Sequence, residues 1–316
     1  MRRALRLTAA GAAIICLSAL STPASALAVG LPVSGAHIVV HFSLPAGQQP
    51  ENIALEPDGA ADLTFAFTGQ VVRVTRGGLI QPLATLPAPP PGAGAPVLGA
   101  PFTAGIVRAP NGIRYVGYST GTADLTGIWR LRPGRLPARV AALPPASLAN
   151  GMALGPRGML YIADSALGVI WRVPARGGTP AVWASGAALA PAGFLGVNGL
   201  KVHGGAVWVT NTDRGTLLRI PIGPGGVAGP IRTVATGLTG VDDLAFAGRG
   251  TILVALNTVS ELAIVRPGGT HTVVLTSADG LSNPTSVAVA GDTIDVPSAA
   301  YLTQVDPNLL RARLTR

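Results

Sequence analysis

The segment Asn150–Val173 reads NGMALGPRGMLYIADSALGVIWRV, and the segment Asn198–Ile220 repeats its pattern as NGLKVHGGAVWVTNTDRGTLLRI. In each copy, short runs of β-branched and aromatic residues alternate with turns that contain Gly, Pro and Asp, as in β-strands. Imperfect copies recur about six times at a spacing of roughly 45 residues, which is typical of repeat proteins. One such unit cannot bury its own apolar faces. The repeat therefore predicts an all-β fold, a single six-bladed β-propeller with four-stranded blades.

The repeat also predicts where each blade begins. The inner strands are expected to start near Pro50, Gly105, Asn150, Asn198, Val241 and Asn283. His37–Phe42 belongs to no repeat, and we expect it to supply an outer strand to the last blade, which joins the two ends of the ring. The propeller is thus expected over residues 27–307, followed by a loosely held basic tail over residues 308–316.

The first 26 residues have the composition of a secretory signal peptide. A basic start with Arg2, Arg3 and Arg6 precedes the apolar stretch Leu7–Leu20, and Ala24-Ser25-Ala26 forms a small-residue cleavage site. We therefore expect cleavage after Ala26, a secreted protein and no membrane span, because the apolar stretch is too short. The single cysteine, Cys16, would leave with this segment, so no disulfide is expected.

The net charge of +9 raises the question of an anionic partner. Without the three signal arginines, the chain still has 20 basic residues against 14 acidic ones, a net charge of about +6. Four arginines recur in strands of apolar-Arg-apolar pattern, and strand alternation turns them away from their apolar neighbours. They are Arg73, Arg130, Arg172 and Arg219. This pattern favours a solvated face, and without interleaved aromatic residues we expect no nucleic-acid partner.

Four inner-strand starts carry oxygen-bearing side chains, namely Glu51, Asn150, Asn198 and Asp242. The inner strands of a propeller line its channel, so these side chains are expected to converge at one mouth. Two carboxylates and two amide oxygens suit a hard divalent cation, Ca²⁺ first, with Mg²⁺, Mn²⁺ or Zn²⁺ as alternatives. The competing interpretation is that Asn-Gly and Asp are ordinary turn residues at strand starts.

The same residues suggest a family. Pro50–Ala54, Asn150–Met152, Val197–Val202 and Asp242–Phe246 resemble the six-bladed propellers of the SMP-30/gluconolactonase/LRE-like family, and Ala163–Val173 and Thr210–Gly215 resemble a secreted microbial branch of it. The resemblance implies a divalent metal held by Glu51, Asn198 and Asp242, with Asn150 contacting the substrate. It also implies hydrolysis of a lactone or related ester, in which Asp242 helps to deprotonate water.

The chain departs from the sugar-lactonase pattern at three positions. Leu148 replaces an Arg two residues before the third-blade Asn, and Gly151 replaces an acidic residue directly after it. Both changes argue against polar sugar lactones as substrates. Asp243 stands where Gly is usual, so it is interpreted as a substrate-binding residue, a metal ligand or a turn residue.

Other motifs carry less weight. Gly117–Gly121 matches the G-x-S-x-G nucleophile elbow, but no helix pattern follows, so a strand-end turn is expected. The four histidines show no zinc-ligand spacing.

The sequence therefore predicts a secreted, metal-dependent hydrolase of a small lactone or ester, expected to be a monomer. The alternative is a non-catalytic propeller that binds a ligand or partner, with a structural metal or none. Lyase or strictosidine-synthase-like chemistry would need a further acid or base in the channel, and no residue is nominated for that role.

Overall fold

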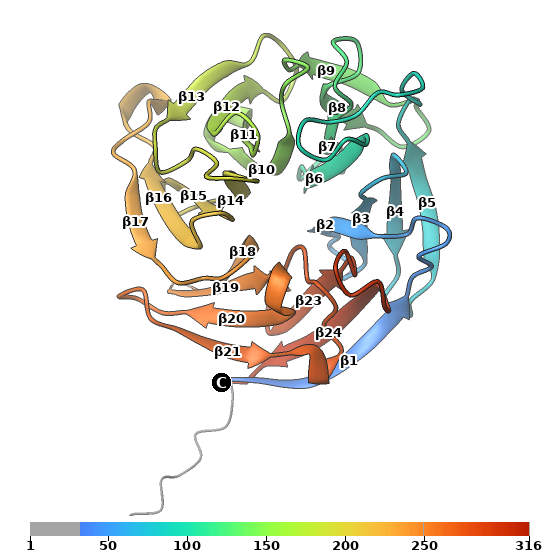
Figure 1. Ribbon diagram of the computed structural model, residues 1–316, viewed down its shortest axis with the longest axis vertical. Helices are drawn as coiled ribbons and strands as arrows, with labels where there is room; N and C mark the ends of the chain where they lie inside the picture. Colours follow the sequence, from blue (N-terminus) through green and yellow to red (C-terminus); the bar gives the residue numbers. More distant parts are fainter. Residues whose placement is uncertain (1–31, 249, 316) are drawn as a thin grey trace, which may run out of the picture. The chain divides into compact units, whose positions relative to one another are not determined.

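The computed structural model describes residues 32–248 and 250–315, so the expected signal peptide lies outside the described residues. Six four-stranded antiparallel sheets surround a central axis (Figure 1), which confirms the predicted propeller. Blades one to five each use four consecutive strands. They are β2 (Pro50–Leu55), β3 (Ala61–Phe65), β4 (Gln70–Val74) and β5 (Ile80–Thr85); β6 (Phe102–Arg108), β7 (Arg114–Ser119), β8 (Gly127–Leu131) and β9 (Ala138–Ala142); β10 (Ala149–Gly155), β11 (Met159–Asp164), β12 (Val169–Pro174) and β13 (Ala181–Ser185); β14 (Val197–His203), β15 (Ala206–Asn211), β16 (Thr216–Pro221) and β17 (Arg232–Ala235); and β18 (Val241–Ala247), β19 (Thr251–Leu256), β20 (Glu261–Val265) and β21 (His271–Leu275).

Blade six joins the two ends of the ring. Its strand order is β22 (Ala288–Ala290), β23 (Thr293–Ser298), β24 (Asn308–Leu314) and β1 (Val33–His41), so the predicted N-terminal outer strand is confirmed. The prediction of a loose C-terminal tail is wrong, because β24 pairs with both β23 and β1. Leu309, Leu310 and Ala312 in this strand are fully buried, so its apolar residues pack in the blade despite its basic composition.

The inner strand of blade six is shorter than expected. We predicted a strand from Asn283, whereas β22 covers only Ala288–Ala290. Asn283 has φ +52°, and Pro284 has no backbone N–H to give to a ladder, so the preceding residues make only an isolated bridge between Pro284 and Ser298.

Each inner strand of blades one to five carries a β-bulge near its start. The pairing register shifts at Pro50/Asn52, Thr103/Ile106, Ala149/Met152, Val197/Leu200 and Val241/Leu244. A bulge leaves residues outside the regular ladder and re-aims their side chains. The residues within these five bulges are Glu51, Ala104-Gly105, Asn150-Gly151, Asn198-Gly199 and Asp242-Asp243.

The glycines of these bulges let neighbouring inner strands approach backbone to backbone. A Cβ atom on Gly151 would lie 2.6 Å from the carbonyl oxygen of Asn198, and one on Gly199 would lie 2.5 Å from the Cα atom of Asp243. Real Cβ atoms do not approach other heavy atoms so closely, so a side chain at either glycine would force the strands apart. These contacts hold neighbouring inner strands close together near the points where the strands begin.

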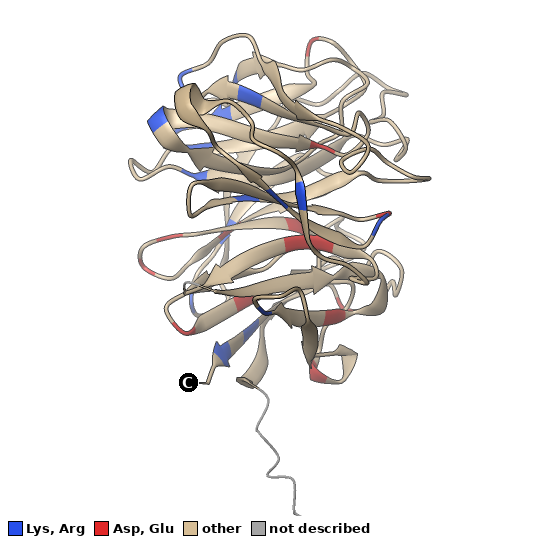
Figure 2. Ribbon diagram, turned by 90° about the vertical axis from the view of Figure 1, so that its left-hand side faces the viewer, with Lys and Arg blue, Asp and Glu red and all other residues tan. Residues whose placement is uncertain are grey.

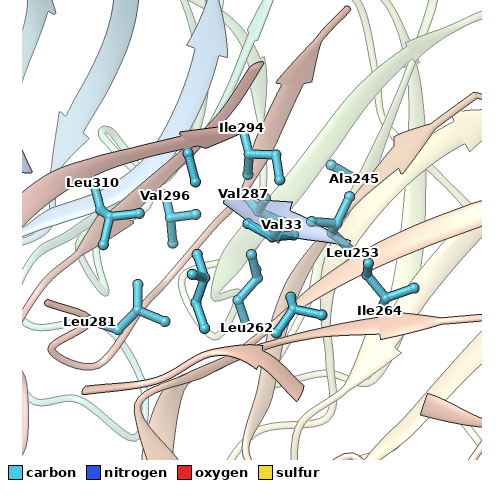
Figure 3. Close-up of a cluster of buried hydrophobic side chains, with 13 residues drawn as sticks. Val33, Ala245, Leu253, Leu262, Ile264, Leu281, Val287, Ile294, Val296 and Leu310 are labelled. Carbon is cyan, nitrogen blue, oxygen red and sulfur yellow. The ribbon is translucent and has the colours of Figure 1, made fainter. Parts of the chain in front are cut away.

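The hydrophobic core lies between neighbouring blades. In Figure 3, Leu253, Leu262 and Ile264 of blade five face Val296 and Leu310 of blade six. A comparable cluster joins blades three and four. Further clusters join the other neighbouring pairs. Every blade therefore buries its apolar faces against two others, as the repeat pattern predicts.

Candidate functional site

The four predicted oxygen-bearing residues meet at one cavity. Glu51 (β2), Asn150 (β10), Asn198 (β14) and Asp242 (β18) are all buried side chains that line a cavity of about 370 Å³ at the mouth where the inner strands start. Each comes from a bulge, which explains why equivalent positions of different blades aim at the same space. Blade two presents Ala104 in its bulge and contributes no polar group there.

Glu51 and Asp242 form a buried acidic pair. Burial raises the pKa of Glu51 to about 8, with a further rise from the charge of Asp243, while a hydrogen bond from Tyr301 opposes the shift. Burial, followed by the charges of Glu51 and Asp243, raises the pKa of Asp242 well above its ordinary value. Both carboxylates are therefore costly to ionise unless a positive charge enters the cavity.

Asn198 is held in place by its amide nitrogen. Its Nδ2 donates to Oδ1 of Asp242 at 3.0 Å and to Oγ1 of Thr212 at 2.9 Å. Its Oδ1 atom has a long contact of 3.5 Å with Oγ of Ser165. This arrangement leaves the amide oxygen with the capacity to bind a cation or a donor in the cavity.

Tyr301 is a site residue that the sequence analysis missed. Its hydroxyl donates to Oε2 of Glu51 at 2.6 Å, and it lines the cavity from the loop between β23 and β24. Burial and the charge of Glu51 raise the pKa of Tyr301 well above its ordinary value, so the hydroxyl stays protonated and remains a donor. Because this loop lies outside the repeated strands, the repeat carried no indication of the residue.

The Tyr301 loop is fastened to blade six. Oδ1 of Asn283 accepts from the backbone N–H groups of Leu302 and Thr303, both at 2.9 Å. Nε2 of Gln304 donates to the carbonyl oxygen of Tyr301 at 2.7 Å. The hydroxyl of Tyr301 is thus presented to Glu51 by a loop with its own internal hydrogen bonds.

Asp243 does not line the cavity, unlike its neighbour Asp242. Its carboxylate accepts from Nζ of Lys201 at 2.6 and 2.8 Å, from Oγ of Ser286 at 2.6 Å and from Nδ2 of Asn52 at 3.3 Å. These partners come from blades four, six and one, so Asp243 ties the inner strands together at the axis. This geometry gives Asp243 a structural role outside the cavity lining, and a part in binding substrate or metal stays a prediction.

Most of the remaining cavity lining is apolar, although Gln49, Asn257, Thr258 and Gln304 also take part in it. Phe67 packs against Phe102 and Tyr301, with ring centroids 5.6 and 5.8 Å apart, and Leu148 lies in the same lining. Leu98, Phe194, Leu195 and Leu302 complete the apolar wall. Leu148 is thus an apolar surface where the sugar-lactonase pattern has an Arg. A side chain in place of Gly151 would meet the backbone of β14.

The donor set fits a hard divalent cation. Two carboxylates and two amides offer only oxygen ligands at the floor of the cavity, and a doubly charged ion would offset the acidic pair. Within residues 32–248 and 250–315, no three His, Cys, Asp or Glu side chains are grouped so as to hold a metal. A cation bound here would therefore depend on the two asparagines as well.

The remaining motifs assemble no second catalytic site in the described part of the chain. Ser119 of the G-x-S-x-G match is fully buried, and its Oγ accepts from the backbone N–H of Ala149 at 2.9 Å. His203 stacks on Phe246 at 4.0 Å, and His41 pairs with Asp306 at 2.5 Å. Among the described residues, no helix is long and apolar enough to cross a membrane.

Solved structures of other proteins share this architecture, although no family model and no curated protein matches the chain. A calcium-binding regucalcin from Agrobacterium tumefaciens has a TM-score of 0.64 and 15% identity, covering 92% of this chain and 98% of its own. A gluconolactonase-like protein has a TM-score of 0.63 and 14% identity, covering 88% and 91%. The PQQ-bound aldose sugar dehydrogenase from Streptomyces coelicolor has a TM-score of 0.62 and 16% identity, covering 88% and 98%.

The chain shares the fold of these proteins. At such low sequence identities the similarity establishes only the six-bladed propeller fold, so the activity has to be argued from the residues of the site.

Proposed function

We propose that the protein is a secreted, metal-dependent hydrolase of a lactone or related ester that is less polar than an aldonolactone. The observation that carries the proposal is the contrast between polar and apolar side chains within one cavity. Buried acidic and amide oxygens form its floor, and aromatic and aliphatic side chains form its wall. An amphipathic substrate with a carbonyl group matches this division, with the carbonyl on the polar floor and its apolar part on the wall.

Glu51, Asn198 and Asp242 would hold the cation, for which Ca²⁺ is the first choice. When bound, such an ion polarises a carbonyl group and makes water more acidic. The carboxylate of Asp242 accepts a proton from water as the water oxygen bonds to the carbonyl carbon. The proton then passes to the ester oxygen that leaves, which yields a hydroxy acid from a lactone. The amide of Asn150 orients the substrate, and Tyr301 holds Glu51.

The comparisons support this proposal at the level of the scaffold. The calcium-binding regucalcin and the gluconolactonase-like protein have the same fold, at 15% and 14% identity. The all-oxygen floor and the apolar wall are the features of this chain itself that favour Ca²⁺ and a less polar ester.

The first test is a calorimetric Ca²⁺ titration of chelator-treated protein, followed by assays on lactones of increasing apolar chain length. Stoichiometric binding that is lost in Glu51→Gln and Asp242→Asn, together with hydrolysis that is lost in Asp242→Asn, is the expected result. Asp306→Asn, which changes a carboxylate in a loop of the same face, is the matched control and should keep both properties. An Asp242→Asn variant with full hydrolytic activity would overturn the proposal.

A non-catalytic binding propeller is the second candidate. It is favoured by Leu148 and Gly151, which leave the cavity without the polar pair of the sugar-lactonase pattern. Specific retention of an apolar ester or lactone without turnover, in the presence of Ca²⁺, would support this candidate.

The predicted secretion is tested separately. Protein recovered from the culture medium of an exporting host should begin at Leu27, as measured by mass spectrometry of its N-terminal peptide. The expected monomer is checked by light scattering on the same material.

A further inference from the structure

The two faces of the propeller differ in charge. Consecutive strands of a blade run antiparallel, so the loops that precede each inner strand share the face of the cavity, and the loops that follow it share the opposite face. Most of the blue Lys and Arg segments lie toward the left in the side view of Figure 2. Within residues 32–248 and 250–315, the loops of the cavity face contain one basic residue, Arg214.

The opposite face carries the other arginines that lie in described loops, and all of them are exposed. They are Arg76, Arg132, Arg135, Arg157, Arg176 and Arg266. Five of these occupy the same connection, between the third and fourth strands, in blades one, two, three and five. The arginine is therefore a repeated feature of one rim of the ring.

Two acidic residues of the same face, Glu56 and Asp58, do not pair with these arginines. Glu56 is paired with Arg108 and Arg114, and Asp58 is paired with Arg73, so strand arginines already occupy these two carboxylates. None of the six loop arginines joins a salt bridge in the described part of the chain. The charge of Arg76 also acts on Asp295, whose carboxylate is paired with Arg311. The exposed guanidinium groups of the six arginines remain accessible to an external anion.

Exposed apolar side chains accompany the arginines. Leu136, directly after Arg135, is 89% exposed, and Leu79, in the loop of Arg76, is 61% exposed. Val227 is 59% exposed and follows Gly226, whose carbonyl oxygen accepts from the guanidinium of Arg172. Three loops of one face thus combine an apolar tip with a nearby cation.

We propose that this face docks on an anionic lipid bilayer, and we name it the arginine face, defined by its six loop arginines with Leu79, Leu136 and Val227. Arginines near an anionic membrane surface are attracted to lipid phosphates, and apolar tips enter the interface between headgroups and acyl chains. The arginines span four blades, so an extended flat surface contacts them together. A soluble polyanion would satisfy the cations but leave the apolar tips in water.

The test uses residues 27–316, which contain the whole ring, because the apolar segment Leu7–Leu20 would itself bind lipid. Cosedimentation is measured with vesicles of phosphatidylcholine and with equal mixtures of phosphatidylcholine and phosphatidylglycerol. We expect binding to the anionic vesicles, weakened by salt and about fivefold weaker in Arg135→Gln. The triple variant Arg76→Gln/Arg135→Gln/Arg266→Gln should bind about a hundredfold more weakly.

Two variants distinguish docking from general attraction, with circular dichroism confirming that each is folded. Arg214→Gln on the cavity face is the matched control and should bind like the parent protein. Leu136→Ser should weaken vesicle binding without changing binding to heparin. No preference for anionic vesicles, or an equal loss in Arg214→Gln, would overturn the proposal. Binding to heparin as tight as to vesicles, with Leu136→Ser unchanged on both, would assign the face to a soluble polyanion instead.

Discussion

At the scale of single residues, the cavity brings together carboxyl groups whose negative charges repel one another. Glu51 and Asp242 are buried near each other and near Asp243, and burial raises the pKa of both. Tyr301 donates to one of them, and Asn198 donates to the other. Such a cluster destabilises the protein unless it binds a proton or a cation, as functional sites commonly do.

Glu51 should make the metal-free protein less stable as pH rises. Its pKa is raised from 4.5 to about 8 in the folded chain, so the folded state binds the proton more tightly than the unfolded state. The stability it contributes is present below about pH 4.5 and is lost as pH rises through 8, by a few kcal/mol. Thermal unfolding in chelator from pH 5 to 9 should show this fall, and Glu51→Gln should reduce it. A pH profile that is identical in the two proteins would contradict the prediction.

Tyr301→Phe should weaken Ca²⁺ binding without unfolding the protein. The variant loses the hydrogen bond to Glu51, and a hydrogen bond to a charged group contributes about 1.5 kcal/mol or more, which is roughly tenfold in affinity. Calorimetry on the variant measures the effect. Tyr118→Phe is the matched control, since the hydroxyl of Tyr118 donates to the carbonyl oxygen of Pro87 and lies outside the cavity lining. Equal Ca²⁺ affinities in the two variants would show that Tyr301 has no role in the site.

At the scale of elements, the bulged inner strands decide both the site and the packing around the axis. In blades one, three, four and five, the first bulge residue aims a side chain into the cavity. In blades two, three and four, a glycine follows and allows the next strand to approach. Blade five has Asp243 at the position of this glycine. The carboxylate of Asp243 accepts hydrogen bonds from residues of three other blades, which link the inner strands there.

Gly151→Ala should destabilise the protein by about 1–3 kcal/mol, the usual cost of overpacking. The new methyl group would meet the backbone of Leu200 and Asn198, which cannot move without shifting β14. Urea denaturation measures the difference in the free energy of unfolding. Gly77→Ala is the control, because a Cβ there has no heavy atom within 4 Å. A Gly151→Ala variant as stable as Gly77→Ala would refute the close packing of β10 and β14.

At the scale of the whole molecule, closure of the ring depends on both ends of the chain. β1 supplies the outer strand of blade six, and β24 lies between it and β23. The core of Figure 3 joins blade six to blade five, so the loss of one blade-six strand exposes apolar surface in two blades. The arginine face and the cavity face point in opposite directions, so docking on a bilayer would leave the cavity mouth open to solvent.

Ending the chain after Pro307 should abolish cooperative folding. The truncation removes β24, including the fully buried Leu309 and Leu310, and leaves β1 without a partner. Near-ultraviolet circular dichroism and a thermal melt check the result, with removal of Arg316 alone as the control. A truncated protein that melts cooperatively like the control would restore the interpretation of residues 308–316 as a tail.

The sequence by itself determined the number of blades, the start of most inner strands and the four polar positions at the cavity, because each is a local pattern that the repeat copies. Only the tertiary structure decided the contribution of Tyr301, the structural part of Asp243 and the place of β24. These depend on contacts between segments far apart in the chain, such as Tyr301 with Glu51 and Asp243 with Lys201, Ser286 and Asn52. The difference in charge between the two faces was also decided by the tertiary structure. The repeat shows which loops are equivalent, but only the closed ring places the equivalent loops of different blades on one face.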